Sequence, residues 1–333
     1  MLRSNVIVSC FLLLLGACNK SSTDTPAPSN NTTVYTGTAS VSQGIGTSTT
    51  VNLFPPGIRI SGMGSVSSSD AQSWIIPAAT NYLQTSFPFA SDLHNIYTAG
   101  HSYTNANVAL NSLNGNDIIT IDATGEVFTA FIFADNYFEL YVNGTPVGKD
   151  PVPYTEFNSC IVRFKTKRPF TLAAKCVDWE EKLGLGVELN GANPYYVGDG
   201  GFVLVLKDAS GAIVTTTDAS WKAQTFYTAP ITDLSCPTES SNYRYTTNCK
   251  TTNASATSYA LHWLVPNNWY ATSFDDSKWP AATLFSNTTV GVNNKASYTN
   301  FTDIFDNSSQ DASFIWSTNL LLDNEVLFRK TVQ

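Results

Sequence analysis

Charged residues are scarce in this 333-residue sequence, at 13% of the chain, and acidic residues outnumber basic ones. Lysine and arginine together number 18 against 26 aspartates and glutamates, so the formal net charge is −8. Proteins that bind nucleic acid usually carry a basic surface, and this balance excludes nucleic acid as a partner. After residue 17 no apolar run approaches the roughly 18 residues of a membrane-spanning helix.

Residues for nucleophilic catalysis and for zinc binding are also few. The chain has three histidines and no G-x-S-x-G sequence, which leaves little from which to build an activated serine. Its cysteines form no C-x-x-C pair beside histidines, so a zinc site is not expected. The best helix signal is a single turn at residues 180–183, which Gly184 and Gly186 end.

Strand patterns, in contrast, recur along the chain, and aromatic residues reach 12%. Asn143-Gly144, between two of the apolar runs, is a strong signal for a tight hairpin turn. Many short strands separated by turns predict an all-β, antiparallel β-sandwich. The expected strands cover residues 117–121, 126–134, 137–142, 160–165, 170–176, 202–206, 212–217 and 326–332.

Two parts of the folded region differ in the strength of this pattern. Residues 125–333 are expected to form the sandwich. Residues 34–124 have a less regular pattern, and they form either a small β-rich N-terminal extension or part of the same sandwich.

The N-terminus has the features of an export signal. Arg3 precedes an apolar run of about a dozen residues, too short to span a bilayer, which ends in small residues before Cys18. Leu15-Gly16-Ala17-Cys18 resembles the lipobox of bacterial lipoproteins, in which the cysteine is acylated and becomes the first mature residue. The alternative is an ordinary signal peptide that contains a cysteine.

The lipobox resemblance implies a signal peptide at residues 1–17 and a lipid anchor on Cys18, with the membrane as partner. Asn19 follows the cysteine, and by similarity to Gram-negative sorting patterns this favours the outer membrane of the cell envelope. Residues 18–33 contain almost no apolar side chains and are expected to form a disordered tether.

Export places the remaining cysteines in an oxidising compartment, where pairing is expected. Four are left once Cys10 and Cys18 are set aside, and four cysteines allow three connectivities. Local geometry favours Cys160–Cys176, across an expected hairpin that turns at residues 166–169. It also favours Cys236–Cys249, which bracket a polar loop.

Four segments resemble the galactose-binding-like jelly-roll domains that accompany α-L-rhamnosidase and β-galactosidase-type glycoside hydrolases. The segments are the strand–turn–strand unit at 134–148, TDASWK at 217–222, FDDSKWPAA at 274–282, and FIW at 314–316 with VLFRK at 326–330. The last strand usually opens such domains but here closes the chain, and no catalytic barrel follows. The resemblance, over residues 126 to 333, therefore implies the fold and a carbohydrate context but not hydrolysis. Trp221, Trp279 and Trp316 are expected to fill the edges of the sandwich.

Aromatic residues in an Asn- and Pro-containing loop are candidates for glycan binding. Trp263, Trp269 and Tyr270 could stack on the apolar faces of sugar rings, or they could pack beneath their own loop.

Two acidic segments suggest other chemistry. Asp178 and Trp179 precede Glu180 and Glu181, and this cluster could bind a ligand, form a turn, or supply one carboxyl group of a glycoside hydrolase. Clustered loop oxygens are typical calcium ligands, so a second group is a candidate for a structural calcium site: Asp303, Asp306 and Asp311.

The leading hypothesis is a membrane-anchored lipoprotein whose sandwich binds polysaccharide or glycan without catalysis. A carbohydrate-active enzyme using the acids near residues 178–181 is one alternative. A structural or adhesive envelope protein is the other.

The lipobox makes a direct prediction about the mature chain. We expect the exported protein to begin at Cys18 and to carry the added mass of acyl chains, which intact-mass and N-terminal peptide analysis of membrane fractions would detect. A mature protein that keeps its first seventeen residues would contradict the anchor.

Overall fold

The computed structural model describes residues 35–57, 59–153, 157–179, 189–190, 193–194, 199–250, 255–307 and 311–333. The expected lipidation site Cys18, the expected signal peptide and the expected tether fall outside these residues. Across the described part of the chain, no helix has the length and apolar character needed to traverse a bilayer.

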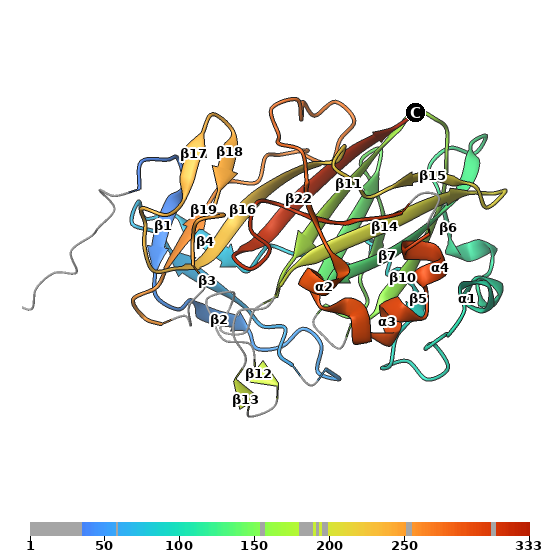
Figure 1. Cartoon of the computed structure of the whole chain (residues 1–333), viewed down its shortest axis with the longest axis horizontal. Coiled ribbons are helices and arrows are strands. Elements are labelled where there is room, and N and C mark those ends of the chain that lie inside the picture. Colours follow the sequence, from blue (N-terminus) through green and yellow to red (C-terminus); the bar gives the residue numbers. More distant parts are fainter. Residues whose placement is uncertain are drawn as a thin grey trace, which may run out of the picture. The chain divides into compact units, whose positions relative to one another are not determined.

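Most of the strands belong to two large sheets (Figure 1). In spatial order, the seven-stranded sheet contains β1 (Ser40–Gln43), β19 (Tyr259–His262), β16 (Lys222–Ile231), β22 (Asp323–Val332), β11 (Phe170–Val177), β8 (Tyr137–Val142) and β9 (Thr145–Lys149). The eight-stranded sheet contains β20 (Thr283–Phe285), β21 (Phe314–Trp316), β14 (Gly201–Asp208), β7 (Glu126–Asp135), β10 (Ser159–Thr166) and β5 (Ser91–His94), with β15 (Ile213–Thr216) beside β14 and β6 (Ile118–Thr120) beside β10. Every pairing in both sheets is antiparallel except the parallel contact between β6 and β10.

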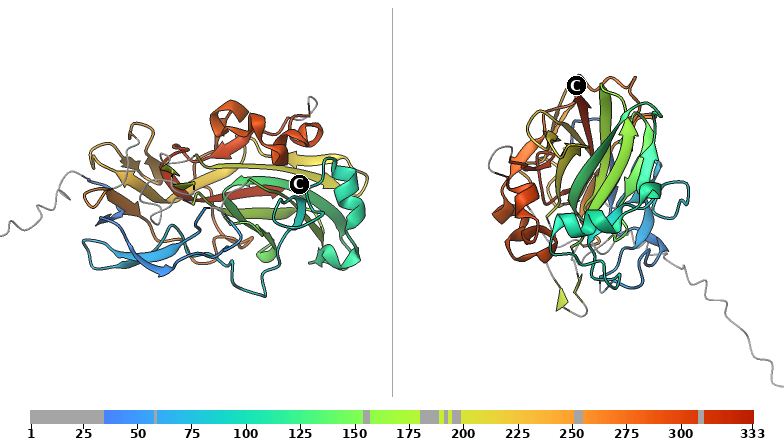
Figure 2. Two further views of the ribbon diagram at one scale, coloured as in Figure 1. Left: turned by 90° about the horizontal axis from the view of Figure 1, so that it is seen from below. Right: turned by 90° about the vertical axis from the view of Figure 1, so that its right-hand side faces the viewer.

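Smaller elements surround these sheets. The smaller sheets are β2 (Thr47–Thr50), β3 (Met63–Ser67) and β4 (Ser73–Ile76) in one, β12 (Leu189–Asn190) with β13 (Asn193–Pro194), and β17 (Thr238–Ser240) with β18 (Tyr243–Tyr245). The short helices are α1 (Ala106–Ser112), η2 (Gly115–Asp117), α2 (Asn287–Val290), η3 (Val292–Asn294), α3 (Ala296–Thr299) and α4 (Thr302–Phe305). Figure 2 shows the helical segment from α2 to α4 lying over the outer side of the strands that include β14.

The core lies between the two large sheets and follows the period of two along each strand. Phe128, Ala130 and Ile132 of β7 point inward from one sheet, and Leu172 and Ala174 of β11 point inward from the other. The structure is therefore an all-β antiparallel sandwich, which confirms the expected fold class.

The expected hairpin turn at Asn143-Gly144 is also present, between β8 and β9. Asn143 has φ 50° and Gly144 has φ 82°, the left-handed backbone region that such a two-residue turn requires.

Residues before 125 contribute to three sheets. β1 pairs with β19 at one edge of the seven-stranded sheet, while β5 and β6 both pair with β10 of the eight-stranded sheet. β2, β3 and β4 form their own sheet.

The expected Cys160–Cys176 disulfide is wrong, because both cysteines are free and buried. The segments around them do not pair as a hairpin: β10 pairs with β7, whereas β11 pairs with β8 and β22. The two cysteines thus lie in facing sheets. Packed sheets stand about 10 Å apart, beyond the roughly 4.4–6.8 Å between the Cα atoms of a disulfide.

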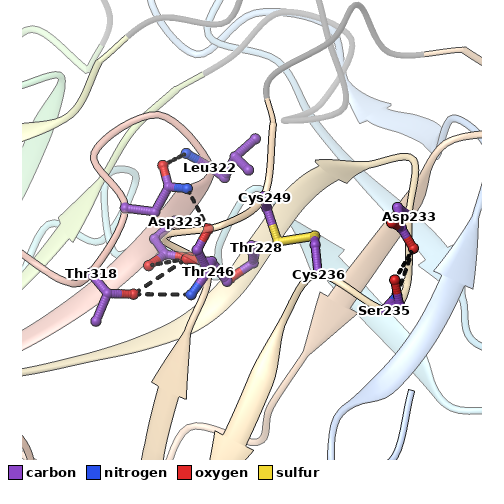
Figure 3. Close-up of a disulfide and its surroundings, with 10 residues drawn as sticks. Thr228, Asp233, Ser235, Cys236, Thr246, Cys249, Thr318, Leu322 and Asp323 are labelled. Atoms are coloured by element: carbon purple, nitrogen blue, oxygen red, sulfur yellow. Dashed lines mark hydrogen bonds between the residues drawn. A yellow bond between two sulfur atoms is a disulfide. The ribbon is translucent and has the colours of Figure 1, made fainter. Parts of the chain in front are cut away.

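The Cys236–Cys249 disulfide is confirmed, with 5.0 Å between the Cα atoms (Figure 3).

Beside this disulfide lies Asp323, a fully buried carboxylate at the start of β22. Its oxygens accept hydrogen bonds from the hydroxyls of Thr228 at 2.6 Å, Ser317 at 2.6 Å and Thr246 at 3.1 Å. Burial nevertheless raises the pKa of Asp323 from 3.8 to about 6, because the hydroxyls offset only part of the desolvation.

The cysteine assignment can be tested by site-resolved alkylation. We expect Cys160 and Cys176 to react with iodoacetamide once the unreduced protein is unfolded, and Cys236 and Cys249 to react only after reduction. Peptide mapping distinguishes the two pairs. Protection of Cys160 and Cys176 in the unfolded, unreduced chain would contradict the assignment.

The raised pKa of Asp323 predicts a dependence of stability on pH. The native carboxyl holds its proton more tightly than the unfolded one, so its stabilising contribution is complete below about pH 4 and is lost as the pH rises through 6. The slope is at most about 1.4 kcal/mol per pH unit. Urea unfolding between pH 4 and 7 should therefore show a shallower dependence of stability on pH in Asp323→Asn than in the native protein.

Asp303 is exposed, so Asp303→Asn is the matched control for Asp323→Asn. Its stability should keep the pH dependence of the native protein. Equal slopes in the native protein and in Asp323→Asn would rule out Asp323 as the source.

Candidate functional site

The outer face of the seven-stranded sheet carries a row of buried charges. In register across β9, β8 and β11 lie Lys149, Glu139 and Lys175, and Glu325 of β22 lies diagonally beyond Lys175. All four are less than a tenth exposed. Alternation of sign lets each buried charge face an opposite one, which reduces the cost of removing it from water.

The segment at residues 79–84 folds over this row. The Nζ of Lys149 donates to the carbonyls of Asn81 at 2.9 Å, Tyr82 at 2.7 Å and Gln84 at 2.8 Å, and the Nζ of Lys175 donates to the carbonyl of Ala79 at 2.8 Å. Hydrogen bonds to charged groups stabilise by about 1.5–3 kcal/mol each, so the row is the anchor of this segment.

Lys175 and Glu325 form the end of the row that opens into a pocket of about 350 Å³. The Nζ of Lys175 is 3.0 Å from Oε1 of Glu325. Burial lowers the pKa of Lys175, but the neighbouring Glu325 and Glu139 carboxylates outweigh that effect and hold the pKa above its usual value. The floor of the pocket is therefore a paired ammonium and carboxylate.

Three adjacent rings form a wall of the same pocket. Trp74 of β4 stacks on His262 of β19 at 5.0 Å and 17°, and His262 in turn lies 5.0 Å from the ring of Tyr227. Burial lowers the pKa of His262 to about 3, so its ring is neutral near pH 7. Nε1 of Trp74 donates to Ser68 Oγ at 2.9 Å, which fixes the orientation of the partly exposed indole.

The loop aromatics expected to bind glycan are placed differently from one another. Trp263 is 6% exposed and lines the same pocket as Trp74. Trp269 is 4% exposed and packs against Tyr141 and Tyr270, while Tyr270 stacks on Tyr141 at 4.6 Å and 8°. The loop folds onto the sheet because Tyr141 and its apolar neighbours Phe226 and Leu327 require cover.

The acidic segment after β11 is only partly described. Asp178 and Trp179 are both buried, and Nε1 of Trp179 donates to the carbonyl of Gly62 at 2.8 Å. Glu180 and Glu181 lie outside the described residues, so the structure does not place the candidate catalytic pair.

The candidate calcium ligands Asp303, Asp306 and Asp311 differ in their surroundings. Asp306 accepts hydrogen bonds from Tyr298 Oη at 2.6 Å and Asn287 Nδ2 at 3.1 Å, whereas Asp303 and Asp311 are exposed. Within the described ranges, no three acidic, histidine or cysteine side chains gather in a geometry that could hold a metal ion.

The pocket residues were not all foreseen. Trp74, Lys175, His262 and Glu325 come from four strands that are far apart in sequence, so no local spacing links them. One signal did exist: Lys175 interrupts the apolar run of β11, and Glu139 interrupts that of β8. A charge at such a position predicts a buried polar network.

Compared with known proteins, the chain matches no family model, no curated protein and no solved structure.

The Lys175–Glu325 pair predicts a non-additive effect on stability. Glu325→Gln leaves a buried ammonium facing a neutral amide and should lower the free energy of unfolding by about 2 kcal/mol or more. Lys175→Met combined with Glu325→Gln should lose less than the sum of the two single changes. Urea unfolding measures all four proteins, and strictly additive losses would contradict the pairing.

Proposed function

We propose that the protein is an extracytoplasmic, lipid-anchored lipoprotein that binds carbohydrate without catalysis, and that its sugar site is the pocket beside Trp74. One observation carries the proposal: a partly exposed indole, held from behind by His262, stands in a pocket whose lining includes an ion pair. This combination suits a ring that is apolar on its faces and polar around its rim.

The chemistry of each group matches a saccharide. The C–H face of a sugar ring can stack on Trp74, while the Lys175 ammonium donates to hydroxyls and the Glu325 carboxylate accepts from them. A volume of about 350 Å³ is at the small end of ligand sites, which favours one or two sugar units.

The resemblance to galactose-binding-like domains gains support from the packing of its motifs. Arg329, in the VLFRK segment, places Nε 2.7 Å from Oδ2 of Asp276 and its guanidinium 5.2 Å from the ring of Phe274, both in the FDDSKWPAA segment. Ala282 of that segment donates its backbone N–H to the carbonyl of Trp221 at 2.8 Å. Three segments far apart in sequence thus form one packed unit.

The lipid anchor on Cys18 would join the folded part at Tyr35. There the Glu239 carboxylate accepts hydrogen bonds from the Tyr35 hydroxyl at 2.6 Å and from the backbone N–H of Thr38 at 2.7 Å. In this proposal the Glu239 contacts hold the first described residues against β17. They would fix the position at which the anchored segment joins the sandwich.

Binding accounts for the pocket better than hydrolysis does. Most glycoside hydrolases use two carboxyl groups, and among the described residues that line the pocket Glu325 is the single acid. The structural or adhesive alternative has its own support, since six of the seven tryptophans are buried and only Trp74 is partly exposed. Trp74 is therefore the residue that separates the two hypotheses.

The proposal predicts that Trp74→Ala weakens binding to a retained polysaccharide at least tenfold, which corresponds to about 1.4 kcal/mol. The measurement is affinity electrophoresis across a panel of neutral polysaccharides, followed by calorimetry on the one that retards the native protein. Tyr243→Ala is the matched control, because Tyr243 is 40% exposed and is not among the residues that line the pocket.

Two results would count against the sugar site. One is equal retardation of the native protein and Trp74→Ala when circular dichroism shows that both are folded. The other is the absence of retardation by any polysaccharide, which would favour the structural role.

A further inference from the structure

A second pocket, of about 460 Å³, lies on the outer face of the eight-stranded sheet. Leu110 of α1 and Ile304 of α4 border it, and Val127, Thr129 and Phe131 of β7 contribute to its lining. It is separate from the Trp74 pocket, which lies on the other sheet.

Two cations face this pocket from the strands on either side of β7. Arg163 of β10 and Lys207 of β14 are both in register with Thr129 of β7, so the three residues form one row across the sheet. Strands in a sheet are about 4.8 Å apart, which places the two cationic Cα atoms roughly 10 Å from each other. Long side chains can converge across that gap on a single bound group.

Among the residues that the structure describes, neither cation has a carboxylate partner. Within the described ranges no Asp or Glu oxygen lies within 4.0 Å of Arg163 or Lys207, whereas Arg168, in the connection after β10, pairs with Glu126. The chain has a net charge of −8, so two adjacent cations in one pocket, with no ion pair to any described residue, suit a bound anion.

One carboxylate, Asp208, also lines the pocket, and one of its two oxygens is held by its own turn. Asp208 Oδ1 accepts from the backbone N–H of Ser210 at 2.9 Å, from the Ser210 hydroxyl at 2.6 Å and from the N–H of Ala212 at 3.1 Å. These bonds lower the pKa of Asp208 and direct its charge toward the turn. Among the described residues, no Asp208 oxygen lies within 4.0 Å of Arg163 or Lys207, so Asp208 forms no ion pair with this row.

The rest of the lining is largely apolar. Leu110, Ile118 and Ile304 contribute aliphatic surface, and the Nζ of Lys207 lies 5.6 Å from the centroid of the Phe131 ring. A ligand in this pocket would gain from apolar contact with its body and from charge-assisted hydrogen bonds to its head group.

We propose that this pocket binds an organic oxyanion, with a carboxylate, sulfate or sulfonate head held between Arg163 and Lys207 and an apolar body on the Phe131 side. Arg163 can hold two oxygens at once with its planar guanidinium, whereas Lys207 contributes a point charge. The site is independent of the proposed sugar site, because the two share no residue.

The test uses calorimetry of the full chain with benzenesulfonate as the probe and benzyl alcohol as its neutral counterpart. We expect saturable binding of benzenesulfonate that weakens as the salt concentration rises, and no binding of benzyl alcohol at the same concentrations. Arg163→Gln and Lys207→Gln should each weaken binding at least tenfold, and Arg163→Lys should keep part of it.

Lys165→Gln is the matched control. Lys165 lies on the same strand and the same face, two residues from Arg163, but does not line the pocket. It should bind benzenesulfonate within twofold of the native protein. An equal loss in Lys165→Gln would mean diffuse surface attraction, and equal binding of benzyl alcohol or no binding of benzenesulfonate would overturn the site.

Discussion

The central strands of the two large sheets are largely buried on both faces, and this constraint organises the rest of the molecule. Every residue of β8 and of β11 is buried, although an antiparallel sheet commonly leaves one face in water. Each outer face therefore needs its own cover. Helices α3 and α4 supply part of it on one sheet, where Tyr298 packs against Phe133, and the loop that contains Trp269 supplies part of it on the other.

On the outer face of the seven-stranded sheet, buried charges as well as apolar side chains contact the covering segments. Glu139 accepts hydrogen bonds from the hydroxyls of Tyr137 at 3.1 Å and Tyr141 at 3.2 Å and lies between two lysines of adjacent strands. The covering segment contributes carbonyls to those lysines. A buried charge that is paired and hydrogen-bonded fixes a single register for the segment above it.

The two pockets lie where this cover is incomplete, and side chains of the underlying strands line each of them. Near Trp74, the end of the charged row faces stacked aromatic rings, which suits a polar ring such as a sugar. Near Phe131, the gap between α1 and α4 leaves Arg163 and Lys207 over an apolar floor, which suits an anion. Different ligand chemistries can thus reside on two faces of one sandwich.

Local sequence determined strands such as β7, β8, β11 and β22, the turn at Asn143-Gly144 and the Cys236–Cys249 disulfide, but β16 was not foreseen. Alternation, left-handed turn residues and short loops depend on neighbours along the chain, so these features were predictable. Sheet partners were not, because β10 and β11 are adjacent in sequence yet belong to facing sheets, which separates Cys160 from Cys176. Only the tertiary structure decided that Trp269 is buried and that Trp74 meets His262. Long-range strand pairing sets those contacts, and no spacing along the sequence encodes which distant strands will share an edge.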